Sequence, residues 1–251
     1  MDKIKVQLIS ADTLSDVQSA CQMTRSMGKF DNPADIAKKE KWDMTKINKM
    51  LELPHSKIAR FTEFKFIITG ASRRFLSQII THHIGCDIMS GSIQYANLTK
   101  NVIPSREMFV VPYDILYNHD NTIKDAYIEH CKQSLEMYAS LVSNSIDTDA
   151  AGYVMPMCVR NNILIKVNLE ELMFIANQRL CRRNTNETRY VVGLMVEKVI
   201  EKTGLLDKFF MPTCVERPCQ EGKYSCGCPV GFDTVHELLD WDFRTLRCVK
   251  K

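Results

Sequence analysis

The chain has 251 residues, a net charge of +3 and ordinary fractions of apolar, aromatic and charged residues. This length and composition are typical of one globular domain, or of one domain with a small appendage. The sequence contains no apolar run that could span a bilayer, no signal-peptide pattern and no Lys/Arg cluster typical of nucleic-acid binding. We therefore expect a cytoplasmic protein without membrane or nucleic-acid partners, whose charge suits a small anionic ligand.

The first half of the chain predicts two strands and three helices. Residues 3–9 alternate weakly and predict a strand, and residues 62–69 place Phe64, Phe66 and Ile68 on one face of a second strand. Gly70 is expected to end that strand. Ser72 is expected to cap the third helix. The three expected helices cover residues 15–28, 33–53 and 73–83, and a loop is expected over 85–91.

The second half predicts mainly helices. Helical spacing of apolar residues predicts a long amphipathic helix over 122–143. Asn168 follows a short strand and is a good N-cap for the next helix. The remaining expected elements are a short helix from Thr148 to near Pro156, a strand over 162–167, and helices over 169–180, 186–204 and 234–241.

Beyond Pro212 cysteine, glycine and proline crowd together, which predicts an irregular tail. The chain has ten cysteines, six of them spread singly along it. Four others cluster in the tail, namely Cys214, Cys219, Cys226 and Cys228. Their spacing lacks the paired Cys-x2-Cys of zinc knuckles, so loosely structural thiols are expected here, with zinc as the weaker alternative.

Two blocks of the sequence carry a resemblance to a known family. The first block runs from His55 to Tyr95, and the second runs from Asn168 to Arg189. The matching positions are His55, Ser56, Phe64, Phe66, Ser72, Arg73, Phe75, Gln78, His82, Ser92 and Tyr95, then Asn168, Arg179, Glu187 and Arg189. In their order and spacing these residues resemble the flavin-dependent thymidylate synthases, in a divergent form.

The resemblance implies a fold and an activity. The fold would be a single α+β domain over residues 1–211, with an antiparallel-type sheet flanked by long helices, followed by a Cys-rich tail over 212–251. The activity would be methylation, or another alkylation, at C5 of a pyrimidine nucleotide such as dUMP. FAD and a folate one-carbon donor would take part, with NADPH as a possible reductant, and sites would be assembled between the subunits of a homotetramer.

The resemblance also assigns roles to residues. It implies Ser92 and His82 as catalytic positions. It implies flavin contacts from His55, Ser56, Thr81, His82, His83 and Asn168. It implies nucleotide contacts from Gln78, Ser92, Gln94, Tyr95 and Arg179. Plainer interpretations remain open for some of them: Gln78 could satisfy a backbone group, Ser92 and Tyr95 could serve a turn, and Arg179 needs an anion that is either Glu187 or a ligand phosphate.

Several family arginines are missing from this chain. The family's Arg-His-Arg triplet is Thr81-His82-His83, or His82-His83-Ile84 if the register is fixed from Tyr95. Other family arginines are replaced by Gln94, Gly152 and Glu170, and a family glutamate is replaced by Arg60. Arginine suits phosphate because its planar fork makes bidentate, charge-assisted hydrogen bonds. Losing several would weaken the grip on flavin and nucleotide phosphates unless other residues replace them.

Two alternatives to an active flavoenzyme follow from these departures and from the tail. The chain could be a catalytically degenerate homologue that acts as a partner subunit of an active enzyme or as a nucleotide-binding protein. It could also be a zinc-dependent nucleic-acid binder, an interpretation that rests on the tail cysteines alone.

Overall fold

The computed structural model describes residues 3–24, 26–27, 32–34, 41–54, 56–100 and 107–241. The strands are β1 (Lys5–Ala11), β2 (Glu63–Ser72), β3 (Cys86–Ser90) and β4 (Arg160–Asn168). The longer helices are α1 (Ser15–Met23), α3 (Met44–Leu51), α4 (Arg73–Ile79), α6 (Asn121–Ser143), α8 (Leu169–Arg179), α9 (Asn186–Thr203) and α10 (Val235–Trp241). Single turns form α5 (Tyr113–Leu116) and α7 (Thr148–Ala151).

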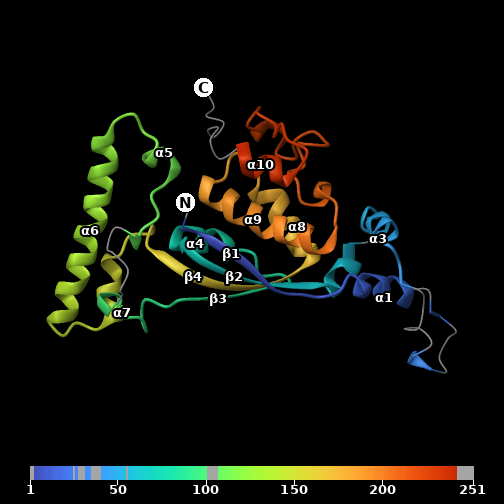
Figure 1. The fold of residues 1–251 in the computed structure, drawn as a ribbon, viewed down its shortest axis with the longest axis horizontal. Coiled ribbons are helices and arrows are strands. Elements are labelled where there is room, and N and C mark those ends of the chain that lie inside the picture. Colours follow the sequence, from blue (N-terminus) through green and yellow to red (C-terminus); the bar gives the residue numbers. More distant parts are fainter. Residues whose placement is uncertain are drawn as a thin grey trace.

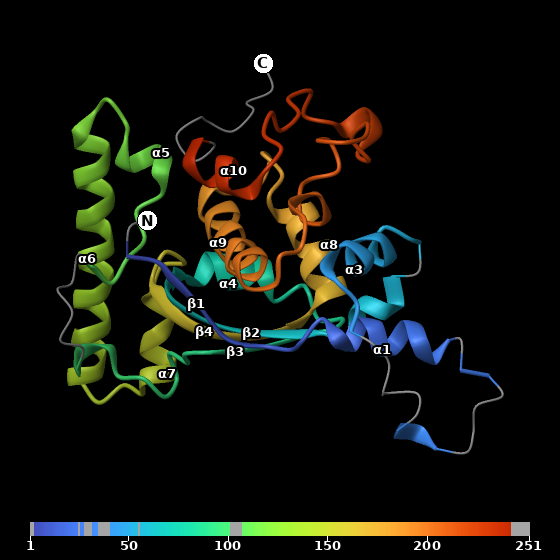
Figure 2. The same ribbon diagram turned by 45° about the vertical axis from the view of Figure 1, so that its right-hand side comes forward.

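The four strands form one sheet in the order β1-β2-β4-β3, and every neighbouring pair is antiparallel. Helices α4, α8 and α9 lie on one face of this sheet, and α6 stands beside it (Figures 1 and 2). The expected α+β fold with an antiparallel sheet and long helices is therefore confirmed. Among the described residues, no helix is both long and apolar enough to cross a membrane.

The core lies between the sheet and the three helices that cover it. Alternation along β2 turns Phe64, Phe66 and Ile68 toward the helices, where all three are fully buried. Ile163 and Ile165 of β4 pair beside them in register and are also buried. The predicted alternation of β2 is therefore confirmed, and it fixes which face of the sheet carries the site.

The other face of the sheet carries an exposed apolar row. Ile67 pairs with Leu164, and Leu164 pairs with Met89, so the three side chains cross three strands side by side. They are 39 %, 43 % and 71 % exposed, respectively. Contiguous exposed apolar residues of this kind mark surfaces that associate with another chain.

The structure corrects several predicted boundaries. The predicted loop over 85–91 is wrong, because residues Cys86–Ser90 form the edge strand β3, paired with β4. The strand β2 does not end at Gly70, which instead adopts a φ of 75° where the register shifts. The helix expected from Ser15 ends at Met23, well before Gly28, which is outside the described residues. Of the expected helix over 33–53, the structure shows α3, while residues 35–40 are outside the described part.

Candidate functional site

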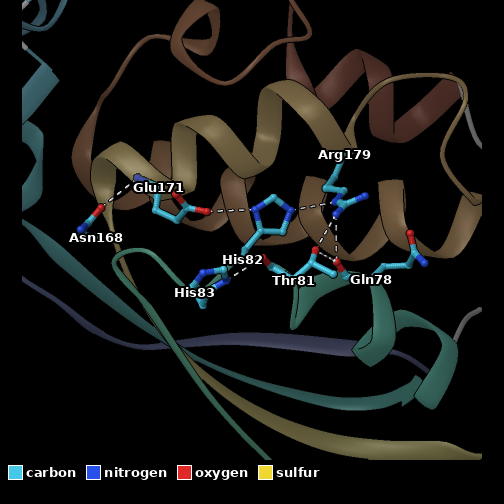
Figure 3. Close-up of polar contacts among 7 residues, drawn as sticks. All are labelled: Gln78, Thr81, His82, His83, Asn168, Glu171 and Arg179. Atoms are coloured by element: carbon cyan, nitrogen blue, oxygen red, sulfur yellow. Dashed lines mark hydrogen bonds and ion pairs between the residues drawn. The ribbon is translucent and has the colours of Figure 1, made fainter.

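The candidate site lies where the end of α4 and the turn after it run along α8, from Glu171 in its first turn to Arg179 at its end (Figure 3). Ser72 caps α4 by accepting a hydrogen bond from the Phe75 amide at 3.0 Å, as predicted. Asn168 caps α8 by accepting from the Glu171 amide at 2.9 Å, also as predicted. The helix expected over 73–83 stops at Ile79, so the chain turns back and carries His82 against α8.

His82 is a buried link between two residues of α8. Its side chain is 6 % exposed. Its Nε2 accepts a hydrogen bond from Nε of Arg179 at 2.9 Å, and its Nδ1 lies 3.0 Å from Oε1 of Glu171. A guanidinium can only donate, so Nε2 holds a lone pair and Nδ1 carries the proton that is donated to Glu171. Both ring nitrogens are thus engaged within the chain (Figure 3).

The electrostatics agree with a neutral imidazole. Burial, the Arg179 guanidinium and His83 lower the pKa of His82 from 6.5 to about 4. Burial and the neighbouring Glu170 carboxylate raise the pKa of Glu171. A proton added at Nε2 of His82 would face the donor of Arg179 and break that hydrogen bond, which is the structural reason the neutral form is favoured.

Arg179 is held in one orientation by this network. Its Nη2 donates to the carbonyl oxygen of Gln78 and to Oγ1 of Thr81, both at 3.0 Å. Burial lowers the pKa of Arg179, although arginine remains protonated in proteins. Its Nη1 donates no hydrogen bond to any residue that the structure describes. The guanidinium is therefore fixed on two sides and has one donor nitrogen left for an anion.

The remaining residues of this corner offer neutral hydrogen-bonding groups. The side-chain amide of Gln78 finds no partner within the described residues, so the interpretation that it only satisfies a backbone group is wrong. His83 is exposed, and its Nδ1 lies 3.1 Å from the carbonyl oxygen of Thr81. Gly85, with a φ of 73°, lets the chain pass so close to Asn168 that an added Cβ would collide with its amide.

The side chains of two predicted flavin contacts, His55 and Ser56, are not described by the structure. His55 lies outside the described residues, and for Ser56 the structure gives the backbone alone, at the start of the 3-10 helix Ser56–Phe61. Their predicted roles stay predictions.

Three predicted nucleotide contacts lie elsewhere. Ser92, Gln94 and Tyr95 follow the far end of β3, where the Gly91 amide bonds the carbonyl oxygen of Asn162. Gly91 lies six positions after Gly85, which at roughly 3.3 Å per residue in a strand is about 20 Å along β3. None of the hydrogen bonds of Arg179 within the described residues involves Ser92, Gln94 or Tyr95.

The segment with Ser92 shows the turn chemistry that was the plainer interpretation. Oγ of Ser92 accepts from the Gln94 amide at 3.2 Å, and the Gln94 carbonyl accepts from Thr148 at 2.7 Å. Tyr95 is 86 % exposed. These contacts do not exclude a ligand role, because they leave the Tyr95 side chain and the Gln94 amide facing outward.

Sequence reasoning missed Glu171. Of the two anions that it offered for Arg179, Glu187 is wrong, and the ligand phosphate stays a prediction. Glu187 does not contact Arg179; it accepts from the amide and the hydroxyl of Ser72 at 2.7 and 2.6 Å. Burial raises the pKa of Glu187. Glu171 could have been noticed because it is an acid three residues after a capping Asn, where a capping-box side chain is expected. In the structure that side chain turns to His82 instead.

A large pocket lies away from this corner. It has a volume of about 440 Å³ and lies at the other end of α4, lined by Ser72, Arg74, Tyr113 and Glu187 among others. None of the predicted flavin or nucleotide residues lines it. Pocket size alone would therefore have pointed away from the His82–Arg179 network.

The tail cysteines group differently from the prediction. Cys228 is disulfide-bonded, which removes it from the weakly predicted metal set. Cys181, which the sequence showed as isolated, lines one pocket with Cys214, Cys219 and Cys226. Within the described ranges no three His, Cys, Asp or Glu side chains are already arranged around a point that could hold a metal ion.

Comparison with known proteins decides the family. Residues 7–203 match the family model described as thymidylate synthase complementing protein, which is more than three quarters of the chain. The chain belongs to the flavin-dependent thymidylate synthase family.

Individual relatives are distant. The chain is 27 % identical over 157 residues to the flavin-dependent thymidylate synthase of Pyrococcus abyssi, covering 62 % of each chain. It is 25 % identical over 184 residues to that of Geobacter sulfurreducens, covering 72 % of this chain and 75 % of the relative. In the Pyrococcus comparison the matched part is thus less than two thirds of the relative's length.

Solved structures share the fold. Thymidylate synthase X from Helicobacter pylori, solved with FAD and dUMP, superposes with a TM-score of 0.61 at 15 % identity, covering 77 % of this chain and 92 % of that one. The UMP/dUMP methylase PolB from Streptomyces cacaoi, bound with 5-Br dUMP, gives 0.62 at 14 % identity, covering 80 % and 92 %.

Two departures from the family pattern that the resemblance implies lie in contact. Arg60 stands where a family glutamate is expected and Glu170 where a family arginine is expected, and in the structure Nε of Arg60 donates to Oε2 of Glu170. An exposed pair of this kind contributes at most about 1 kcal/mol to stability. Its consequence for the site is that Arg60 is engaged with a carboxylate and does not simply replace a lost phosphate-binding arginine.

Other replacement candidates are also engaged or distant. Arg183 donates to the carbonyl oxygen of Tyr224 at 2.7 Å and so holds the tail. Arg74 lines the large pocket at the opposite end of α4. Among the described residues, Arg179 therefore brings a guanidinium group to this corner whose Nη1 has no hydrogen-bond partner within the chain.

Proposed function

We propose that the protein binds a pyrimidine nucleoside monophosphate, UMP or dUMP, together with FAD, and alkylates C5 of the pyrimidine with a folate one-carbon unit. The observation that carries the proposal is the fixed Arg179, held by His82 and Gln78 with its Nη1 free of described partners. A charged, preoriented donor next to the unpaired amide of Gln78 suits the anionic and polar edges of such a nucleotide.

The roles of the chain's own residues follow from the geometry. Arg179 and Gln78 bind the nucleotide. His82 acts as a positioning residue, because both its ring nitrogens are engaged and it reaches a ligand only through Arg179. Glu171 fixes the tautomer that lets His82 accept from Arg179. Neutral donors from Thr81, His83 and Asn168, with His55 and Ser56, are proposed to line the flavin.

The hydrogen-bonding groups at this corner can be compared with those that FAD requires. The described residues here fit the neutral edges of a flavin ring, since they offer hydroxyl, imidazole and amide groups. They offer few cations for its phosphates. When bound and reduced, FAD would supply the hydride that completes the alkyl group, with NADPH as the proposed reductant. The cationic contacts to its phosphates are proposed to come from a second copy of the chain.

A site shared between chains also accounts for the separated residues. Ser92, Gln94 and Tyr95 make no described contact with Arg179, and a neighbouring subunit can bring its own Ser92 segment to that corner. We propose a homo-oligomer, a tetramer as the resemblance implies, that associates through the open sheet face with Ile67, Leu164 and Met89. The cytoplasm is the proposed location, and residues 212–251 are proposed to be an appendage of the catalytic domain.

The alternative of a non-catalytic partner subunit is less well supported. The relatives that match are named as synthases, and a solved neighbour is named as a methylase. The ion pair of Arg60 with Glu170 supports the view that these two departures compensate each other. Compensation of this kind is expected of a folded and selected protein, although retention of a fold does not by itself retain a function.

Flavin retention tests the proposal. The purified protein, incubated with FAD and passed through gel filtration, is expected to keep a flavin absorption spectrum, and its flavin fluorescence is expected to change on addition of UMP or dUMP. The preferred nucleotide then enters turnover assays with methylene-folate and NADPH. A protein that holds neither flavin nor either nucleotide would exclude the proposed enzyme.

Assembly is tested by charging the open face. Leu164→Lys places an ammonium group in the middle of the exposed apolar row, and light scattering coupled to gel filtration is expected to show a fall from oligomer to monomer. Lys65→Glu, a charge change on the same face of β2 that removes no apolar surface, serves as the control and is expected to leave the mass unchanged. An unchanged mass in Leu164→Lys would place the interface elsewhere.

A further inference from the structure

Four cysteine thiols come together at the base of the tail. Cys181 belongs to the connection between α8 and α9, whereas Cys214, Cys219 and Cys226 belong to the tail. All four line one pocket of about 300 Å³, all are of intermediate exposure, and none of them is in a disulfide. Because these thiols come from two separate segments and line one pocket, a single metal ion bound to them would join the two segments.

The loop that carries one of these thiols holds it in place. Sγ of Cys226 donates to the carbonyl oxygen of Cys228 at 3.3 Å. The amide of Cys228 donates to Sγ of Cys226 at 3.4 Å, across Gly227 with its φ of 72°. Hydrogen bonds from backbone amides to sulfur stabilise a thiolate that is bound to a metal ion.

The surrounding charge also suits a metal–thiolate centre. A divalent ion with four thiolates carries a net charge of −2, and the same pocket is lined by Arg182 and Arg217. Two guanidinium groups beside the thiols balance that charge.

The tail needs such a link. Within residues 212–234 the only regular element is the 3-10 turn Gly222–Tyr224. Irregular stretches longer than about 12–15 residues are uncommon in compact domains without a function or a constraint. The tail nevertheless packs on the core through Cys214, Val215 and Val230, and Arg183 bonds the carbonyl of Tyr224. A metal tie at its base would fix this packing.

We propose that Cys181, Cys214, Cys219 and Cys226 bind one Zn²⁺ that fastens the tail to the α8–α9 connection. Four thiolates in a tetrahedral arrangement are a usual structural zinc set, and zinc binding and folding of the surrounding segment are coupled. The four sulfur atoms line the pocket without yet sharing a centre, so binding requires cysteine rotamers to turn inward. This site is separate from the Arg179 corner and does not depend on the proposed enzymatic activity.

Metal analysis of the full chain, purified without chelator, tests this assignment. About one zinc per chain is expected for the wild type. Cys181→Ala and Cys226→Ala are expected to weaken zinc binding by more than about 100-fold in competition with a chromophoric chelator. Cys158→Ala, which removes a thiol that lies in a different pocket, is the matched control and is expected to keep the metal.

Two further measurements keep the outcome clear if a variant does not fold. Cobalt loaded into the wild type is expected to give the visible bands of a tetrahedral thiolate site, and native alkylation followed by mass spectrometry is expected to show these four cysteines protected until EDTA is added. A metal-free protein in which the four thiols react freely, or in which they are joined as disulfides, would overturn the proposal. So would zinc that Cys181→Ala retains with wild-type affinity. Metal content is measured whether or not flavin binds.

Discussion

Arg179→Ala is expected to lower the affinity for UMP or dUMP by about 10- to 100-fold. A hydrogen bond to a charged group contributes roughly 1.5–3 kcal/mol, and each 1.4 kcal/mol is about tenfold in affinity. The guanidinium is already oriented by His82, Gln78 and Thr81, so little conformational entropy is lost when it meets an anion. Isothermal titration of the flavin-loaded protein with each nucleotide measures the change.

Two control variants separate the effect of the positive charge of Arg179 from the effect of its hydrogen-bonding geometry. Arg74→Ala removes an exposed arginine from the first turn of α4, at the opposite end of that helix from Gln78, and is expected to bind nucleotide as the wild type does. Arg179→Lys keeps the charge but cannot maintain the fork that bonds His82, Gln78 and Thr81, so an intermediate affinity is expected. Nucleotide binding by a folded Arg179→Ala protein at wild-type strength would refute the assigned role. Circular dichroism establishes that the variants are folded.

Most of the fold could be predicted because local signals agreed with the tertiary structure. Phe64, Phe66 and Ile68 alternate as a half-buried strand must, and the caps Ser72 and Asn168 begin helices where predicted. The element that was missed, β3, is a five-residue edge strand between two glycines. Its strand conformation depends on pairing with β4, which is a contact distant in sequence and leaves little local pattern.

Four residues that the resemblance assigns to the site lie in contact, and their roles stay predictions. Arg179 donates hydrogen bonds to His82, to the Gln78 carbonyl oxygen and to Thr81. The sequence could not show where the His82 side chain points. Helix α4 ends four residues earlier than expected, and the turn that follows directs His82 inward onto Glu171. The same limitation applies to Arg60 and Glu170, which lie 110 positions apart and could be recognised as partners only in three dimensions.

The buried imidazole also makes stability depend on pH. The unfolded chain takes up a proton on His82 near its ordinary pKa of 6.5, whereas the folded protein does so only near 4. Between these two values the unfolded state holds more protons, so the free energy of unfolding falls as the pH is lowered through this window. The difference corresponds to about 3 kcal/mol, which is a large fraction of the stability of a typical domain.

Two other buried groups change the stability with pH in the opposite direction to His82. Their contribution must be separated from that of His82. The raised pKa values of Glu171 and Glu187 mean that their folded forms hold protons more tightly than the unfolded chain, so their contributions to stability fall as the pH rises through their folded pKa values. The contribution of His82 is therefore measured as a difference between two proteins. His82→Gln removes the titration while its side-chain oxygen can still accept from Arg179.

Urea unfolding of both proteins between pH 7 and pH 4 gives this difference. The wild type is expected to lose about 3 kcal/mol more stability than His82→Gln over that range, although the variant starts from a lower stability at pH 7. Arg179→Ala removes a positive charge and the hydrogen bond at Nε2, so it is expected to raise the pKa of His82 and to flatten the same acid limb. Parallel curves for wild type and His82→Gln would show that His82 titrates normally, and the neutral link that orients Arg179 would then be wrong.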